Sequence, residues 1–192
     1  MKSKNFRKLI IDNAQEIFSR FGLKKTTVDD IAATINKAKS SIYYYFKSKE
    51  EIYEAVIEKE ADILRIEILK EINKCETPQD KIRAYVLTRM KMFHKLANFY
   101  TAFQKEYIEN YSFINNIRTK YDIEELEIIS KILDEGIKKY NLQIKDVGLT
   151  AFAILTAMKG FEFPWTIEKD IKRIEDDINC LLDILFYGLL KR

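Results

Sequence analysis

The chain of 192 residues is poor in the residues that make tight turns, with five glycines and two prolines. Sandwiches, barrels and doubly wound sheets need many such turns, so the scarcity disfavours them and points to long helices joined by few loops. Hydrophobic residues make up 47% of the chain and charged residues 33%. This composition is sufficient for a full core and is not that of a disordered chain. We therefore expect an all-α fold.

Cysteine and histidine are also scarce, with two cysteines and one histidine. The two cysteines, Cys75 and Cys180, lie far apart in the sequence, which excludes a disulfide framework and the ligand spacing of a zinc site. A reducing, cytoplasmic setting is expected. The single histidine, His94, argues against a hydrolytic triad or a His-rich metal site, and no glycine-rich phosphate loop is present. The sequence predicts no catalytic residue, no metal and no cofactor, and the chain is not expected to be an enzyme.

Long uninterrupted apolar runs are also missing. Residues 1–20 alternate charged and apolar side chains, so no secretory signal is expected there. The most apolar stretch, residues 147–163, contains Lys159 and is followed by Pro164. It is about as long as the shortest spanning helices, but its lysine favours a buried helix over a membrane span. No membrane partner is expected.

The net charge of +3 conceals an uneven distribution. Residues 1–48 hold ten basic side chains against four acidic ones and so carry +6, whereas residues 49–192 carry −3. A basic segment on a mildly acidic body is typical of a nucleic-acid-binding head. From charge alone, a chance concentration of basic residues in a lysine-rich chain is equally compatible with this distribution.

Hydrophobic periodicity and capping signals predict about nine helices. Gly22 is expected to end the first helix, Ser48 with Glu51 to cap the long fourth one, and Phe163-Pro164 to close the apolar eighth one. Thr166 is expected to cap the last helix. The predicted helices span approximately residues 6–21, 27–35, 39–46, 49–73, 77–93, 97–110, 112–140, 146–163 and 166–190.

Residues 27–46 have the proportions of a helix-turn-helix, with Asn36 in a turn of about three residues. Such a unit lays its second helix in the major groove of DNA. The outward side chains of that helix are hydroxyls, a lysine and tyrosines, which suit base edges and phosphate oxygens: Lys39, Ser40, Ser41, Tyr43 and Tyr44. A helix cannot bury the whole run 43–46 (YYYF) on one side, so one or two of its tyrosines are expected to face outward.

At these residues the sequence resembles the N-terminal domain of the TetR family. The resemblance is carried by residues 11–18 (IDNAQEIF), 21–22 (FG), 26–32 (TTVDDIA) and 41–52 (SIYYYFKSKEEI), in this order and at these spacings. It covers about a quarter of the chain. It implies an all-helical homodimeric repressor with a DNA-binding head, here residues 1–48, and a ligand-binding and dimerisation body, here residues 49–192.

The resemblance also implies site residues in the head. It places Ile31, Ile42, Tyr45 and Phe46 in the head's core. The turn reads Asn36-Lys37 where the family usually has Gly-Val, so either Lys37 adds a phosphate contact or the turn is shifted. Ser40-Ser41 stands where Gly-Thr is usual, which leaves the base preference open. The predicted DNA contacts are Thr27, Lys37, Lys39, Ser40, Ser41, Tyr43, Tyr44 and Lys47.

The last two predicted helices offer more apolar surface than one body can cover. Pairing two copies into a four-helix bundle would bury the excess, and two heads would then read a palindrome of double-stranded DNA. A monomer with a large core is the alternative. The predicted interface consists of Phe152, Leu155, Ile178, Leu182, Leu185 and Leu189.

Aromatic side chains are dense in the middle of the body, where the family resemblance implies an inducer cavity. Aromatic walls with a few polar groups suit an apolar or amphipathic small molecule, and we favour a long apolar one such as an acyl chain. For any single residue, packing in the core is the stronger interpretation. The predicted ligand contacts are Arg89, Met90, Phe93, His94, Phe103, Tyr107, Tyr121, Met158, Phe161 and Trp165.

The expected function is repression relieved by such a ligand, with the helix from Lys49 to Asn73 linking head to cavity. The alternative is a helical protein-interaction module that kept the fold and lost sequence-specific DNA binding, because Lys37 cannot pack in the turn as valine does. Salt dependence separates the two, since a protein that contacts several phosphates loses affinity steeply as salt rises.

Overall fold

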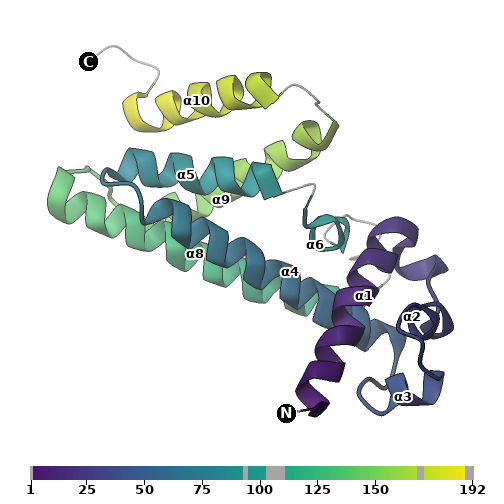
Figure 1. Ribbon diagram of the computed structural model, residues 1–192. Helices are drawn as coiled ribbons and strands as arrows, with labels where there is room; N and C mark the ends of the chain where they lie inside the picture. The colour runs from purple at the N-terminus through teal and green to yellow at the C-terminus, as the bar shows by residue number, and fades with distance from the viewer. Residues whose placement is uncertain (1, 93–94, 103–110, 168–170, 189–192) are drawn as a thin grey trace. The chain divides into compact units, whose positions relative to one another are not determined.

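The computed structural model describes residues 2–92, 95–102, 111–167 and 171–188 (Figure 1). Every regular element within these ranges is a helix, which confirms the predicted all-α class. The helices are α1 (Lys2–Lys25), α2 (Val28–Thr34), α3 (Lys39–Tyr43), α4 (Lys49–Ile72), α5 (Pro78–Met92), α6 (Ala97–Ala102), α8 (Ser112–Tyr140), α9 (Val147–Ile167) and α10 (Ile171–Tyr187).

The chain divides into two compact units. The head unit comprises Met1–Ile63 and Leu96–Thr119, and the body unit comprises Leu64–Lys95 and Lys120–Arg192. The long helices α4 and α8 each contribute residues to both units. These units reflect packing within the chain and do not show which residues bind DNA or ligand. The predicted boundary after residue 48, between a DNA-binding and a ligand-binding domain, therefore stays a prediction.

The core of the head unit forms where helical spacing predicts it. Ile10, Ile31 and Ile42 are fully buried, and Phe46 is nearly so. Phe18 of α1 meets Tyr53 of α4 edge to face, with ring centroids 5.0 Å apart. The apolar faces of α1, α2 and α3 thus share one core with the start of α4.

The end of α1 differs from the simple pattern. Gly22 has φ 74° and ψ 166°, a conformation that glycine adopts readily and that interrupts the helix before it resumes to Lys25. Beyond this break Leu23 is fully buried, whereas Phe21 is 59% exposed. The break therefore turns Leu23 inward at the place where unbroken periodicity would have put Phe21.

The boundaries of the last two helices were predicted wrongly. α9 continues through Pro164 to Ile167, and Thr166 lies inside it, so neither residue ends or caps a helix. Proline removes one backbone hydrogen-bond donor, but a helix can continue through it when the hydrogen bonds of the neighbouring turns are kept. α3 is also shorter than predicted, because it ends at Tyr43.

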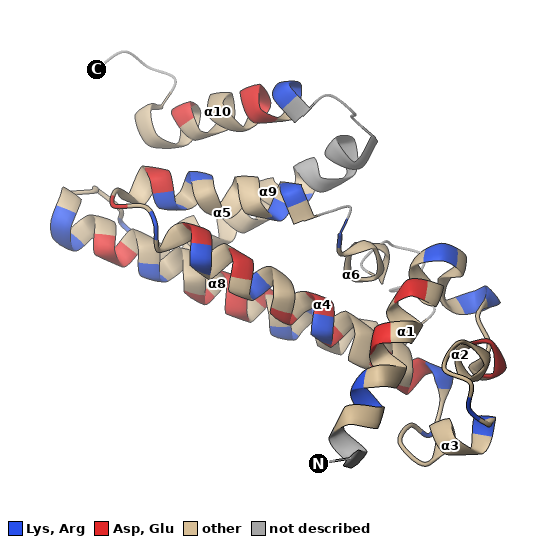
Figure 2. Ribbon diagram, viewed as in Figure 1, with Lys and Arg blue, Asp and Glu red and all other residues tan. Residues whose placement is uncertain are grey.

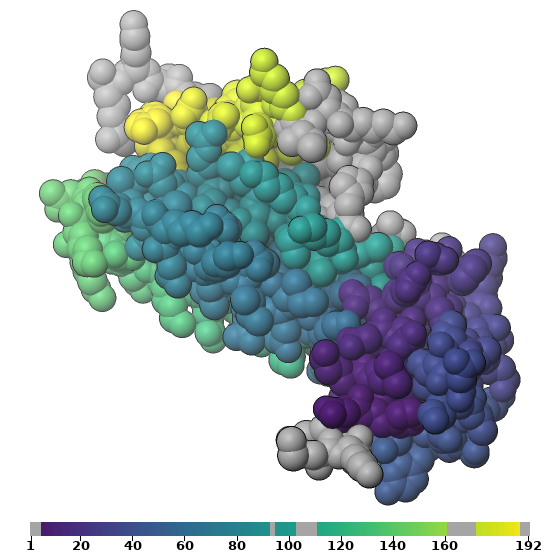
Figure 3. Space-filling model, viewed as in Figure 1, coloured from purple at the N-terminus to yellow at the C-terminus, as the bar shows by residue number. Residues whose placement is uncertain are grey.

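The body unit is built from α5, α8, α9, α10 and the second half of α4. α5 packs against both α9 and α10, and the space-filling view shows α10, in yellow, lying against α5 (Figure 3). The buried side chains of the body unit include Ile82, Ile129, Leu155 and Ile178. In the described part of the chain no helix has the length and apolar character needed to cross a membrane.

Candidate nucleic-acid interface and ligand site

A capping box starts the first helix of the helix-turn-helix. The Thr27 hydroxyl accepts the Asp30 N–H at 3.1 Å, and the Asp30 carboxylate accepts the Thr27 N–H at 2.8 Å. The side-chain hydrogen bond from Thr27 is the main cause that lowers the pKa of Asp30. This reciprocal pair fixes the start of α2 on the exposed side of the head.

The turn lies where the sequence places it. Asn36 has φ 51°, in the left-handed region that asparagine tolerates better than most residues. The Asn36 N–H donates to the Ala33 carbonyl and the Lys37 N–H to the Ala32 carbonyl, which closes α2. The turn is therefore not shifted, and Lys37 is exposed instead of packed.

The second helix presents polar and aromatic side chains to solvent. Tyr44 is 82% exposed, while Tyr43, Lys39 and Ser40 are also exposed and Ser41 is half-buried. Tyr45, by contrast, is half-buried, with its ring centroid 5.2 Å from that of Phe6. The outward-facing tyrosines predicted from the run 43–46 are thus Tyr43 and Tyr44.

An ion pair between the two helices was missed by sequence reasoning. Lys39 Nζ lies 2.7 Å from Asp29 Oδ2, so the first residue of α3 is tied to α2. This hydrogen bond is the main cause that raises the pKa of Lys39. Figure 2 shows the acidic residues of α2 beside the basic residues that flank α3. Asp29 and Lys39 are ten residues apart, a spacing that no single-helix rule connects.

The link from α3 to α4 is held by Glu51. Its carboxylate accepts the Lys47 N–H at 2.6 Å, and its own N–H donates to the Ser48 hydroxyl at 3.2 Å. The predicted cap at Ser48 is present. It fixes the backbone at Lys47 while the Lys47 side chain stays exposed.

The eight predicted DNA contacts therefore lie on α3 and in the segments that flank α2 and α3. Seven of them are exposed and Ser41 is half-buried. Their contact with DNA itself stays a prediction.

The predicted ligand residues of the body are in varied environments. Tyr121, Met158 and Arg89 are buried and Met90 is half-buried. Phe93, His94, Phe103 and Tyr107 lie outside the described residues, and the side chains of Phe161 and Trp165 are also outside the description. Contact of these ten residues with a ligand stays a prediction.

Arg89 belongs to a buried polar cluster. Arg89 Nη1 pairs with Glu125 Oε1, and the Tyr85 hydroxyl donates to the same carboxylate oxygen at 3.1 Å. Arg89 also donates to the Tyr85 oxygen at 3.3 Å. Burial, followed by the charge of Glu125, holds the pKa of Tyr85 well above its ordinary value. α5 and α8 are thus joined through charged groups inside the body unit.

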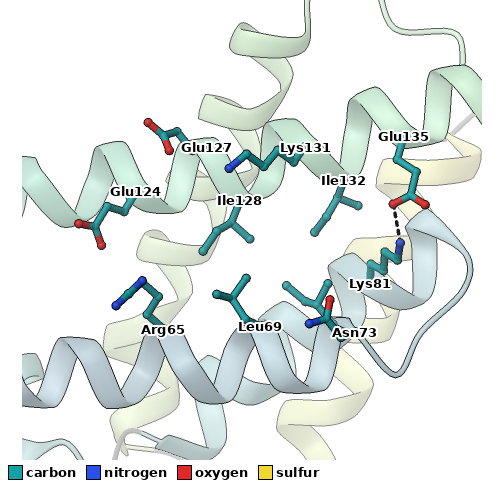
Figure 4. A pocket seen from close by; sticks show the side chains of 11 residues that line it. Arg65, Leu69, Asn73, Lys81, Glu124, Glu127, Ile128, Lys131, Ile132 and Glu135 are labelled. Atoms are coloured by element: carbon teal, nitrogen blue, oxygen red, sulfur yellow. Dashed lines mark hydrogen bonds and ion pairs between the residues drawn. The ribbon is translucent and has the colours of Figure 1, made fainter.

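A cleft of about 460 Å³ lies between the second half of α4 and α8 (Figure 4). Leu69, Ile128 and Ile132 line its apolar part, and the Lys81–Glu135 ion pair, 2.5 Å long, stands at one end. None of the predicted ligand residues lines it. Its charged residues have the spacing of an ordinary solvated helix face, so the sequence carried no signal for it.

The predicted dimer residues fall into three groups. Leu155, Ile178 and Leu182 are buried within their own chain, which leaves them little surface for a partner. Phe152 and Leu185 are exposed, at 57% and 40%, and Leu189 lies outside the described residues. Leu149, which the prediction omitted, is 65% exposed one turn before Phe152.

Side chains that could bind a metal ion do not form a cluster in the part of the chain that the structure describes. No group of three or more histidine, cysteine, aspartate or glutamate side chains there is placed to hold an ion. Cys75 and Cys180 are both free thiols.

Comparison with known proteins identifies the class of this fold and head. Residues 10–56 match the family model described as "Bacterial regulatory proteins, tetR family". Over these residues the chain matches the TetR family, which confirms the resemblance seen in the sequence.

Individual relatives extend the likeness over the whole chain. The transcriptional regulator QacR of Staphylococcus aureus is 26% identical over 189 residues, which cover 97% of this chain and all of QacR. The biofilm operon negative regulator IcaR of the same species is 40% identical over 77 residues, about 40% of each chain. The structure of FadR from Bacillus subtilis in complex with stearoyl-CoA shares the fold, with a TM-score of 0.71 and 24% identity over 95% of this chain and 99% of FadR.

Proposed function

We propose that this protein is a ligand-responsive transcriptional repressor that binds a palindromic DNA operator as a homodimer. The observation that carries the proposal is the exposed surface of α3 and its flanks. A positioned helix-turn-helix there presents hydroxyl, phenol and lysine side chains to solvent. These are the groups that bind base edges and phosphates, and the relatives QacR and IcaR are named as transcriptional regulators. Such a protein would work on DNA in the cytoplasm.

The exposed apolar residues of the last two helices support the homodimer. Leu149 and Phe152 on α9 lie one turn apart, and Ile184, Leu185 and Tyr187 on α10 are exposed as well. Exposed apolar side chains on both helices are typical of a protein contact, and a two-fold axis would let the same surface of each copy take part.

A small-molecule inducer is supported by the body unit. Buried aromatic and sulfur side chains such as Tyr121 and Met158 lie in the same unit as the buried polar cluster of Arg89. Apolar walls with few polar groups suit an apolar or amphipathic molecule. FadR, which has the same fold, was crystallised with stearoyl-CoA. A ligand that favours a conformation with poor operator affinity would release the DNA by shifting the population.

The first experiment is selection of bound fragments from random duplex DNA, followed by salt titration of the best fragment. A palindrome whose affinity falls steeply with salt is expected, because each neutralised phosphate adds about −0.9 to the slope of log affinity against log salt. Lys47→Gln should lower that slope by about one unit per head, whereas the matched variant Lys145→Gln, an exposed lysine of the body unit, should leave it unchanged.

Shallow, sequence-independent binding by the wild type would contradict the proposal and favour the protein-interaction module. Lysine 37 was the reason for that alternative. Its exposed side chain and unshifted turn are also compatible with an additional phosphate contact.

A further inference from the structure

A buried carboxylate joins three helices inside the head unit. Glu60 of α4 is 1% exposed. Its Oε1 accepts Gln15 Nε2 of α1 and Asn98 Nδ2 of α6, each at 2.8 Å, and its Oε2 accepts the Phe99 N–H at 2.8 Å. Two other helices therefore direct three donors at one side chain.

A second layer of hydrogen bonds holds these partners in place. Asn98 Nδ2 also donates to the main-chain carbonyl of Gln15 at 3.0 Å, so α6 reaches α1 directly as well as through Glu60. Gln15 Oε1 accepts Lys59 Nζ at 2.6 Å, and the same ammonium lies 2.5 Å from Asp12. The start of α6 and the middle of α1 thus belong to one polar network.

The chemistry of this position differs from that of a core filler. Burying a carboxylate costs free energy unless donors satisfy it, and burial is the main cause that raises the pKa of Glu60, with hydrogen bonds from Asn98, Phe99 and Gln15 opposing it. An aliphatic side chain would fill the space without this cost. The carboxylate instead provides directional hydrogen bonds, because its two oxygens fix where the donors of α1 and α6 must lie.

The positions of these helices in the chain give the network a role. α6 follows α5, a helix of the body unit, after a few residues. α1 packs against both α2 and α6. A change at the start of α6 therefore reaches the helix that supports the DNA-reading pair through bonds that meet on Glu60.

We propose that Glu60 is a positioning residue that couples the start of α6 to α1, and through α1 to the DNA-reading helices. This coupling rests on the proposed regulatory function, because it supplies the route by which a ligand in the body would weaken operator binding. Coupling between two sites is reciprocal. If an ordered start of α6 strengthens operator binding, operator DNA must stabilise the start of α6 by the same free energy. This stabilisation can be measured before any inducer is identified.

The test measures hydrogen exchange at the Phe99 amide, whose acceptor is Glu60, in full-length protein. Without DNA, Gln15→Met should accelerate this exchange, and should have no additional effect in a Glu60→Gln background. With the selected operator, exchange at Phe99 should slow by about 5- to 150-fold in the wild type and remain unchanged by DNA in Glu60→Gln. Glu58→Gln, an exposed glutamate of the same helix, is the matched control and should behave as the wild type.

Two results would overturn the coupling role. One is Phe99 exchange that Gln15→Met leaves unaltered. The other is an operator that slows Phe99 exchange equally in the wild type and in Glu60→Gln, because a purely structural glutamate would change the exchange rate with and without DNA by the same factor. If Glu60→Gln does not fold, Gln15→Met takes its place in the DNA experiment. A wild type that binds no operator would contradict the proposed function instead, and the experiment without DNA would still decide whether α6 and α1 are coupled.

Discussion

Lys39 and Asp29 form an ion pair that joins the two helices of the helix-turn-helix, with Nζ and Oδ2 2.7 Å apart. Both side chains are substantially exposed, so the pair contributes little to stability. The ion pair instead matters for the proposed recognition of DNA. The aspartate holds one of the predicted phosphate-binding lysines and places a negative charge beside the proposed interface.

Asp29→Asn should therefore strengthen binding to DNA at low salt and increase the salt dependence. Removing the carboxylate releases Lys39 for a phosphate, which is expected to make the slope of log affinity against log salt steeper by about 0.9. Fluorescence anisotropy with the selected operator and with a scrambled duplex measures both. Asp134→Asn, at an exposed position of α8, is the control, and an unaltered slope in Asp29→Asn would show that Lys39 does not contact phosphate.

Tyr44→Ala should weaken operator binding by roughly tenfold, about 1.4 kcal/mol. Tyr44 is 82% exposed, so its removal should change the free energy of unfolding by no more than about 0.5 kcal/mol. Tyr44→Phe separates the hydroxyl from the ring. Full affinity in Tyr44→Ala would remove this residue from the interface.

Phe152→Glu should dissociate the proposed dimer into folded monomers, because it places a charge beside Leu149 on the exposed apolar face of α9. Light scattering combined with size-exclusion chromatography measures the mass. Ile66→Glu is the matched control, since Ile66 is equally exposed at 57% but lies on α4. A dimer that persists in Phe152→Glu and dissociates in Ile66→Glu would move the interface to α4.

Arg89→Met should destabilise the protein by about 3–5 kcal/mol, because it leaves Glu125 buried without its cation. The double variant Arg89→Met/Glu125→Met should be much less destabilised, since neither charge is then buried alone. Urea denaturation provides the free energies, with Arg83→Met as an exposed control. A double variant as unstable as the sum of the single variants would mean that the two residues do not act as a pair.

The stability contribution of Glu60 should depend on pH. Burial raises its pKa above the ordinary value of 4.5, so the folded protein holds this proton more tightly than the unfolded chain. Its contribution is then largest below pH 4.5 and falls as the pH rises through the raised value. The unfolding free energy of the wild type minus that of Glu60→Gln should decrease between pH 4 and pH 7. Other carboxylates, such as Asp12, are present in both proteins and cancel. A difference that grows with pH would contradict the raised pKa.

Local signals in the sequence predicted much of the head. The Thr27–Asp30 capping box, the left-handed Asn36 and the Ser48 cap each depend on residues within four positions of one another, and each is present. The same local reasoning failed at Pro164, where the preference of one residue was outweighed by the rest of its helix.

The long-range polar contacts could not be predicted. Glu60 and Asn98 are 38 residues apart, and Glu60 has the spacing of a charged residue on the solvated face of a long helix. Only the packing of α1 and α6 on α4 shows that this carboxylate is enclosed. For the same reason the sequence could not tell which apolar residues of the last two helices would be buried in their own chain, as Ile178 is, and which would be left exposed, as Phe152 is.

The break at Gly22 has a consequence for the genetics of this protein. Its backbone, at φ 74° and ψ 166°, lies in a region open essentially to glycine alone, and it turns Leu23 into the core of the head. Every missense change of this codon adds a Cβ atom and a strain of about 1–3 kcal/mol. In a marginally stable domain that is enough to make the allele conditional: the encoded protein would keep its head folded in cool cultures and lose it in warm ones. Codon 22 is therefore a place to find temperature-sensitive mutants that alter none of the predicted DNA-contact residues.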